Sequence, residues 1–366
     1  MLHSLQLTHF KNYTGQGIAL SPGINCFVGL NGMGKTNVLD AVHYLCLTKS
    51  HKGLPDKLLL QHEAPFFRVE GIFDTEGERH KVVLKMPADK RKELEVNGTV
   101  ITRLADHIGK FPAVMIAPDD VDLVQEGSEE RRRYLDSTLS QVSVEYLQHL
   151  LVFNNLLKQR NALLKNFAAQ RYFEPILLEA IDRQMPRPAA AIQSERFAMV
   201  EKIQPLFQEL YQAISGGREQ AQIELVSDWP EKTDYSAVLR ENLEKDRYSE
   251  RTAAGPHRDD MAFLLDGYPL KKFASQGQLK SFLLALRLAQ YEYLRVEKGQ
   301  APILLLDDIF DKLDSQRVRQ LVQLLLDRAV PQILITDTQR TRMEEVMTGL
   351  GADFRVFLVE NGVVLV

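Results

Sequence analysis

A glycine-rich segment between a predicted strand and a predicted helix constrains this chain more than any other feature. It runs from Gly29 to Thr36 and fits the pattern G-x-x-x-x-G-K-[ST]. Residues 24–28 before it are mostly apolar and predict a short strand, and residues 36–47 carry apolar side chains at helical spacing. Strand, glycine loop and helix together form the context in which this pattern binds nucleotide phosphates.

The residue types in this loop suit a triphosphate. Glycines let the backbone turn tightly and bring its N–H groups close to a phosphate at the positive end of the following helix. We expect Lys35 to reach the β- and γ-phosphates and the Thr36 hydroxyl to ligate Mg²⁺. A chance glycine turn before a core helix is the alternative, and the matching flanks argue against it. The predicted nucleotide-binding residues are Gly29, Leu30, Asn31, Gly32, Met33, Gly34, Lys35, Thr36 and Asn37.

A second buried strand, ending in two acids, complements the glycine loop. Residues 303–306 are four consecutive aliphatics, which favours a central parallel strand, and Asp307 and Asp308 follow them. We expect Asp307 to orient Mg²⁺ and its waters, and Asp308 to polarise the attacking water, so that Lys35 and Asp308 are the predicted catalytic residues. Two acids that merely end a core strand are the alternative reading, which the phosphate loop disfavours.

A second anion site is predicted far along the chain. Ser275, Gln276, Gly277 and Gln278 precede or begin a predicted helix over residues 279–296. Ser275 is expected to cap this helix, so that its hydroxyl and the free N–H groups bind a phosphate. One chain does not need two phosphate-binding helix starts for one γ-phosphate, whereas two chains facing head to tail do.

Composition describes an ordinary globular chain. It has 366 residues, of which 45% are hydrophobic, and a net charge of −4, which argues against a protein that coats nucleic acid with its whole surface. Cys26 and Cys46 occupy apolar positions and are expected to be reduced, buried thiols. We find no signal-peptide pattern and no membrane-length apolar run, and expect a cytoplasmic location.

The pattern along the chain predicts an α/β fold with an antiparallel layer and an inserted helical arm. Alternating residues before and after the glycine loop predict antiparallel strands, with a turn at residues 13–17 and a hairpin turn at Asn97-Gly98. Two long helical runs, from a capped start at Ser128 to 167 and from 173 to 214, predict an arm broken near residues 140–143 and at Pro186 and Pro188. We expect residues 1–117 to form the first half of an ATPase lobe, 118–255 the arm and second lobe, and 256–366 the other half.

Two basic stretches are candidates for phosphate contact. Residues 49–57 form a basic loop directly after the glycine-loop helix, and residues 158–187, where the helical runs meet, carry six basic and three acidic residues. In both cases an ordinary solvated surface is the alternative. His257, in a polar turn at 255–260, is expected to have a structural or interface role.

Several ordered motifs resemble those of ABC-type ATPases. Residues 274–278 resemble the signature motif, 304–308 the Walker B strand, and 311–314 the D-loop, which implies that Asp314 also contacts nucleotide. In that superfamily two heads enclose two nucleotides, each signature serine reaching the γ-phosphate held by the other chain. The resemblance therefore implies an ATP-dependent homodimer.

Within that superfamily the chain resembles the RecF family of bacterial recombination mediators. The resemblance covers the whole length, through residues 7–13, 29–37, 117–124, 131–136, 157–164, 255–260 and 273–290. It implies an ATPase head with a short helical arm, ATP and Mg²⁺ as cofactors, and ATP-dependent binding of DNA. It also implies action with RecO and RecR to load recombinase at gapped DNA in repair, replication restart and SOS induction.

Departures from the transporter pattern predict slow hydrolysis. Asp337 stands where transporters have a switch histidine, Asp308 replaces the usual glutamate, and the Q-loop glutamine is replaced near residues 117–120, where Asp119 or Asp120 is a candidate to face the metal. We expect adenine contacts near residues 10–13. The rival interpretations are a transport ATPase subunit, a small-molecule P-loop kinase, and an SMC-like clamp without a repair role.

Overall fold

The computed structural model describes residues 1–217, 219–229, 233–310 and 315–365, and divides the chain into two compact units. The head unit comprises Met1–Asp120 and Gln290–Val366, and the arm unit comprises Val121–Ala289. The first boundary lies close to the expected one at residues 117/118. The second differs, because residues 256–289, which we expected in the ATPase lobe, belong to the arm unit, where their strand β10 pairs with β9.

The first sheet of the head unit is antiparallel, in the order β2-β1-β4-β5-β6-β7. The chain turns between β1 and β2 at Lys11 and Asn12, so the expected turn at residues 13–17 is wrong. The hairpin turn at Asn97-Gly98 is confirmed between β6 and β7, with positive φ at both residues as a tight hairpin requires. The strands are β1 (Leu2–Phe10), β2 (Tyr13–Ala19), β4 (Phe66–Thr75), β5 (Glu78–Pro87), β6 (Glu93–Val96) and β7 (Thr99–Val100).

The second sheet of the head unit has the order β15-β14-β3-β13-β12-β8, in which all neighbours are parallel except β14 and β15. The strand predicted at residues 303–306 lies inside this sheet, fully buried, between β13 and β8. The strands are β3 (Gly23–Val28), β8 (Ala113–Ile116), β12 (Ile303–Leu306), β13 (Gln332–Asp337), β14 (Phe354–Glu360) and β15 (Val363–Leu365).

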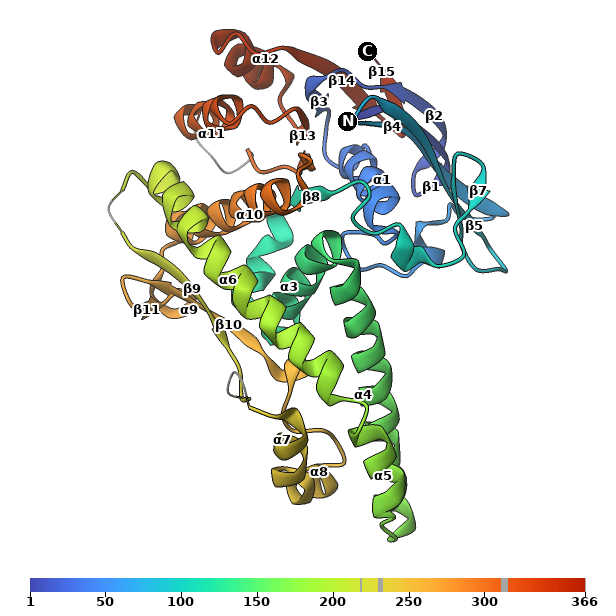
Figure 1. Ribbon diagram of the computed structural model, residues 1–366. Helices are drawn as coiled ribbons and strands as arrows, with labels where there is room; N and C mark the ends of the chain where they lie inside the picture. Colours follow the sequence, from blue (N-terminus) through green and yellow to red (C-terminus); the bar gives the residue numbers. More distant parts are fainter. Residues whose placement is uncertain (218, 230–232, 311–314, 366) are drawn as a thin grey trace. The chain divides into compact units, whose positions relative to one another are not determined.

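Helix α1 (Lys35–Leu47) lies between the two sheets and is buried along almost its whole length, contacting β4 of the first sheet and β8 and β13 of the second (Figure 1). Gly71 of β4 permits this approach, because a Cβ there would lie 2.8 Å from a methyl carbon of Leu45. Cys26 and Cys46 are free and buried, as expected. The remaining helical segments of this unit are η1 (Asp56–Leu59), η2 (Leu104–Asp106), α11 (Ser315–Asp327) and α12 (Arg340–Gly349), and η3 (Pro118–Val121) lies at its boundary.

The arm unit consists of a long helical pair and a small antiparallel sheet in the order β11-β10-β9. Helices α4 and α6 run side by side along the arm, and the predicted breaks at Ser143 and Pro186 are confirmed (Figure 1). The break expected at Pro188 is wrong, because Pro188 lies in the first turn of α6, where a proline costs no helical hydrogen bond. Ser128 is inside α3 rather than capping it, since Gly127 is the N-cap. The elements are α2 (Asp122–Gln125), α3 (Ser128–Val142), α4 (Val144–Gln170), α5 (Pro175–Asp182), α6 (Pro186–Ser215), β9 (Ala221–Val226), α7 (Tyr235–Glu241), α8 (Leu243–Ser249), η4 (Pro256–Arg258), β10 (Asp260–Leu265), β11 (Tyr268–Pro269) and α9 (Leu270–Phe273), with α10 (Gln276–Lys298) continuing into the head unit.

Two buried arginines connect segments of the arm unit, and one of them, Arg196, contacts the polar turn at residues 255–260. Arg196 of α6 donates to the carboxylates of Asp259 and Asp136, each at 2.7 Å. Arg160 of α4 donates to Asp182 at 2.7 Å and to Asp246 at 2.6 Å. Removing one partner of such a buried pair typically costs about 3–5 kcal/mol. The buried ion pairs of Arg196 and Arg160 therefore hold the arm unit together.

Among the described residues, no helix has the length and apolarity needed to cross a membrane.

His257 of the same turn predicts a pH-dependent stability. Its Nε2 lies 2.9 Å from the Thr252 carbonyl oxygen, and its Nδ1 is buried with no hydrogen-bond partner among the residues that the structure describes. Burial, together with the charges of Arg258, Arg132 and Arg160, lowers the pKa of His257 from 6.5 to about 4. The unfolded chain takes up the proton at higher pH than the folded chain, so we expect stability to fall by up to about 3 kcal/mol as pH drops through that window.

Urea unfolding at pH 7.5 and pH 5 checks this prediction. A His257→Gln variant keeps a donor for the Thr252 carbonyl but has no titrating group, and should lose less stability on acidification than wild type. His62→Gln is the matched control, because His62 is exposed. Equal acid sensitivity of wild type and His257→Gln would contradict the assignment.

Candidate nucleotide-binding site

Close contacts with neighbouring residues explain two of the glycines in the glycine loop, one contact with a backbone oxygen and one with a side chain. Gly29 has φ of 157°, and a Cβ there would lie 2.3 Å from the Val359 carbonyl oxygen. Gly34 has φ of 114°, and a Cβ there would lie 2.4 Å from the side-chain nitrogen of Asn12. Any larger residue at either position would push the loop away from its supports. At Gly32 a Cβ would meet no atom within 4 Å, and its φ of 83° is the reason for glycine.

The β1–β2 turn holds the loop from outside. Asn12 donates to the Met33 carbonyl at 3.0 Å and accepts from Asn37 of α1 at 2.7 Å. The Tyr13 hydroxyl donates to the Gly34 carbonyl at 3.0 Å. Phe10 and Tyr13 are fully buried, whereas Lys11 and Asn12 between them are partly exposed, and the adenine contacts expected near residues 10–13 stay a prediction. Asn12 and Tyr13 support the glycine loop, a role that periodicity alone does not reveal.

Lys35 begins helix α1 with its ammonium group at the loop. Its Nζ donates to the carbonyl oxygens of Gly29 at 2.9 Å and Leu30 at 3.1 Å, and lies 3.5 Å from Asn31 Oδ1. The residue is 4% exposed. The ammonium is therefore already positioned among loop atoms, where a bound phosphate would replace carbonyl contacts with a stronger charge-assisted one.

The two predicted halves of the site meet inside the head unit. Thr36 Oγ1 donates to Asp307 Oδ1 at 2.9 Å, across a sequence separation of 271 residues. A hydroxyl and a carboxylate are oxygen donors of the kind that Mg²⁺ prefers, so this pair fits the predicted metal site. Burial raises the pKa of Asp307, while hydrogen bonds from Thr336 and Thr36 and the charge of Lys52 oppose that rise.

Thr336 at the end of β13 organises both acids, and the sequence analysis did not assign it a role. Its hydroxyl donates to Asp307 Oδ1 at 2.8 Å and lies 3.3 Å from Asp308 Oδ1, and it accepts the Asp308 N–H at 2.8 Å. Asp308 has φ of 44°, a left-handed conformation that aspartate tolerates better than most residues. The signal that would have identified Thr336 is a threonine near the end of one buried strand, next to the strand that ends in the two acids.

A Thr336→Val variant should impair turnover more than nucleotide binding. The change leaves the Asp308 N–H without its partner and removes one of the two hydroxyls that donate to Asp307 Oδ1, a loss of about 1–3 kcal/mol in the alignment of the acids. We expect hydrolysis to fall by about one to two orders of magnitude with a smaller change in ATP affinity. Thr336→Ser, which keeps the hydroxyl, should restore activity, and unimpaired hydrolysis by the valine variant would contradict this role.

The acids proposed for the Q-loop position have protein partners. Asp119 Oδ1 lies 3.6 Å from His51 Nε2, and interactions with that histidine are the main cause that lowers the pKa of Asp119. Asp120 is buried and accepts the Ala117 N–H at 3.0 Å. In the described part of the chain no group of three or more His, Cys, Asp or Glu side chains is placed to hold a metal ion, and a metal-facing role of Asp119 or Asp120 stays a prediction.

The residue at the switch position is held by an arginine. Asp337 is buried, and both its oxygens accept from Arg342 Nη2, at 2.8 and 2.7 Å. Its Oδ1 also accepts the Gln339 N–H at 2.7 Å. The Asp337 carboxylate, at the end of β13, is therefore already paired with Arg342 and hydrogen-bonded to the Gln339 N–H.

Ser275 forms a reciprocal cap at the start of α10. The Gln278 N–H donates to Ser275 Oγ at 3.3 Å, and Gln278 Oε1 accepts the Ser275 N–H at 2.7 Å, which is a capping box. Gln278 Nε2 also donates to Glu219 at 2.6 Å. Ser275 and Gln276 are exposed and Gly277 is half-buried. The expected cap is confirmed. Residues 311–314, including Asp314, lie outside the described residues.

The parallel sheet, the glycine loop and the acid-ending strand define an ABC/SMC-type P-loop ATPase head with an inserted arm. A family model described as RecF/RecN/SMC N terminal domain matches residues 1–364. The DNA replication and repair protein RecF of Parabacteroides distasonis is 38% identical over 362 residues, covering 99% of this chain and 98% of the relative. RecF of Flavobacterium johnsoniae is 39% identical over 356 residues, covering 97% and 99%. The chain belongs to the RecF family.

Solved structures agree with this assignment. A structure of the recombination mediator protein RecF with ATP, in the RecFOR pathway, superposes with a TM-score of 0.90 at 28% identity and covers 100% of this chain and 96% of that one. An Smc head bound to the C-winged helix domain of ScpA superposes with a TM-score of 0.59 at 18% identity, covering 99% and 95%. The Smc head shares the fold of this chain.

Proposed function

We propose that this protein is an ATP-dependent DNA-binding recombination mediator. In this proposal ATP and Mg²⁺ bind the head unit, two copies dimerise around the nucleotide, and the dimer binds DNA. The observation that carries it is the hydrogen bond between Thr36 and Asp307, since it joins the phosphate loop to the acid-ending strand at 2.9 Å. The RecF relatives, named for DNA replication and repair, support the biological assignment.

The head unit supplies the groups for a slow hydrolysis. Lys35 would bind the β- and γ-phosphates, and Thr36 and Asp307 would hold Mg²⁺, which neutralises phosphate charge when bound. Asp308 would accept a proton from the attacking water, while Thr336 keeps its backbone in place. Residues 29–34 and Asn37 would surround the phosphates through backbone N–H groups and side-chain amides.

The second half of each site is proposed to come from another copy. Ser275, with Gln276, Gly277 and Gln278, begins a 23-residue helix, and its hydroxyl is exposed on a capped helix start. Such a start offers backbone N–H groups and a positive dipole end to an anion. Asp314 is proposed to contribute from the D-loop.

Downstream roles follow the family. We propose action in the cytoplasm with RecO and RecR to load recombinase at gapped DNA, in repair, replication restart and SOS induction, as one RecF structure's description places that protein in the RecFOR pathway. The net charge of −4 implies contacts through local patches. DNA affinity should therefore fall steeply with salt and depend little on base sequence.

Sedimentation with and without ATP tests the dimer. Ser275→Arg places a bulky cation at the proposed γ-phosphate contact and should leave the protein monomeric with ATP, while still binding nucleotide in the head unit. Ser128→Arg is the matched control, because it alters a serine at another helix start of the arm unit. ATP turnover by a monomer indifferent to Ser275→Arg would instead favour a small-molecule kinase.

A further inference from the structure

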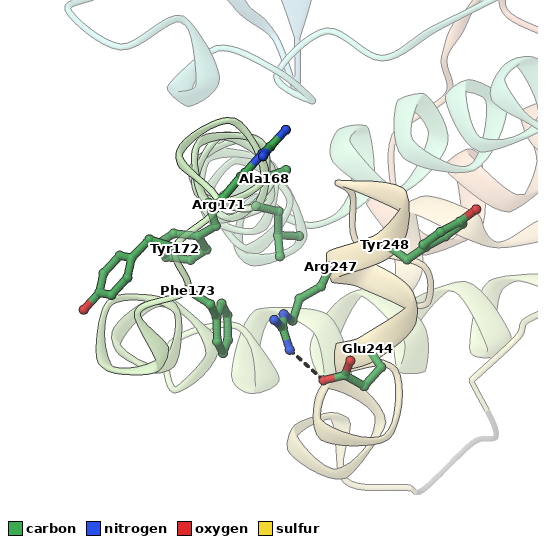
Figure 2. Close-up of a pocket in the computed structure, with 9 residues that line it drawn as sticks. Ala168, Arg171, Tyr172, Phe173, Glu244, Arg247 and Tyr248 are labelled. Carbon is green, nitrogen blue, oxygen red and sulfur yellow. Dashed lines mark hydrogen bonds and ion pairs between the residues drawn. The ribbon is translucent and has the colours of Figure 1, made fainter.

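A cavity of about 390 Å³ lies at the tip of the arm, remote in sequence from every residue assigned to nucleotide. It opens between the end of α4, the loop after it and α8, all within the arm unit (Figure 2). Leu164, Phe167 and Phe173 give it an apolar lining, and the two phenylalanine rings pack edge to face with centroids 5.3 Å apart. A side chain entering here would meet a preformed apolar surface.

Exposed apolar side chains line this cavity or follow its lining closely in the sequence. Tyr172 is 60% exposed and Tyr248 is 93% exposed, and in Figure 2 they point outward on opposite sides. Ile176 and Leu177, in the first turn of α5, are 73% and 53% exposed. Such a cluster on a soluble protein marks an interaction surface, and tyrosine and arginine are the residue types enriched at binding hot spots.

The charges at the rim specify the occupant. Arg247 lies with its guanidinium carbon 4.2 Å from the Phe173 ring centroid and is paired with Glu244 at 2.8 Å. Arg171 lines the cavity, and Lys165 follows the lining residue Leu164 on α4. Both cations are exposed, and neither pairs with a carboxylate in the described part of the chain. Two cations beside an apolar cavity complement a carboxylate beside an aromatic or aliphatic side chain.

A nucleic-acid strand fits these observations less well. Glu174 and Glu244 stand at the same rim, and α8 carries as many acidic as basic residues, so a phosphate backbone would meet no continuous positive surface. Base stacking would use the tyrosines but leaves the exposed Ile176 and Leu177 without a role. An acidic protein segment uses all of these features.

We propose that the arm tip binds a segment of another protein that inserts an aromatic side chain into this cavity and places carboxylates against Lys165 and Arg171. The proposal goes beyond nucleotide and DNA binding, and it does not depend on either. Helix α4, which is 27 residues long, presents the site at its C-terminal end.

Fluorescence anisotropy with two labelled pentapeptides tests the proposal on the full chain without nucleotide. One peptide has a tryptophan flanked by two aspartates on each side, and the other has lysines in place of the aspartates. We expect the aspartate peptide to bind at least about ten-fold more tightly. Ala168→Trp, which fills the cavity from an exposed position on α4, should weaken it by at least as much. Ala169→Trp, exposed but outside the lining, should not.

Charge reversal provides a second test of the proposal. The double variant Lys165→Glu, Arg171→Glu should prefer the lysine peptide, whereas Lys158→Glu, an exposed change elsewhere on α4, should behave as wild type. Absence of saturable binding up to about 1 mM, equal binding of both peptides, or indifference to Ala168→Trp would overturn the proposal. Loss of oligothymidine binding or of self-association in Ala168→Trp, without peptide binding, would assign the site to single-stranded DNA or to a second copy.

Discussion

A Lys35→Met variant is expected to stay monomeric at ATP concentrations that dimerise wild type. The Lys35 ammonium lies among the carbonyl oxygens of the glycine loop, at 2.9 and 3.1 Å from two of them. Methionine keeps the length of the side chain but removes the charge that would meet the phosphates. A charge-assisted hydrogen bond is worth about 1.5–3 kcal/mol, so ATP affinity should fall by about one to two orders of magnitude.

Equilibrium binding of a fluorescent ATP analogue and sedimentation with ATP measure the two parts of this effect. Lys90→Met is the matched control, since Lys90 is an exposed lysine between β5 and β6, outside every stretch assigned to phosphate. Wild-type affinity and dimerisation in Lys35→Met would show that the triphosphate binds elsewhere.

An Asp308→Asn variant should do the opposite and accumulate as an ATP-bound dimer. Asparagine keeps the shape of the side chain and tolerates the φ of 44°, so the backbone contact with Thr336 should persist. It cannot accept the proton from the attacking water. Loss of a positioned general base typically lowers the rate by about 10²–10⁴-fold.

Single-turnover hydrolysis and sedimentation after ATP addition check this prediction. Alanine is a poorer test, because a left-handed conformation strains it and loss of activity would then have two causes. If the asparagine variant hydrolyses ATP at the wild-type rate, Asp308 is not the base. If the asparagine variant fails to dimerise with ATP, Asp308 acts in nucleotide binding rather than in hydrolysis.

Local sequence signals were sufficient where a backbone pattern and a residue type coincide. The glycine loop, the buried strand before Asp307 and the Asn97-Gly98 hairpin each combine a periodicity with residues that few other structures need. The buried strand and the hairpin are confirmed, and so is the position of the glycine loop between a strand and a helix, while its binding of phosphate stays a prediction. The cap at Ser275 was predictable for the same reason, since serine followed three residues later by glutamine is a capping box.

Contacts between distant residues were not predictable in this way. The turn expected at residues 13–17 is a strand because Tyr13 is drawn into the core under the loop, where its hydroxyl reaches Gly34. Thr336 contacts Asp307 and Asp308 from a neighbouring strand. Residues 256–289 belong to the arm unit because β10 pairs with β9. Such pairings depend on sheet topology, which a single sequence specifies weakly.

Mixing two inactive variants tests the central claim most directly, namely that a serine from one copy completes the site of another. Lys35→Met and Ser275→Arg should each sediment as monomers with ATP. If the site is shared between copies, a mixed dimer contains one intact pair, Lys35 from the second variant and Ser275 from the first, so the mixture should form dimers. If both residues act within one chain, neither variant has an intact site, and a mixture that stays monomeric with ATP would contradict the account.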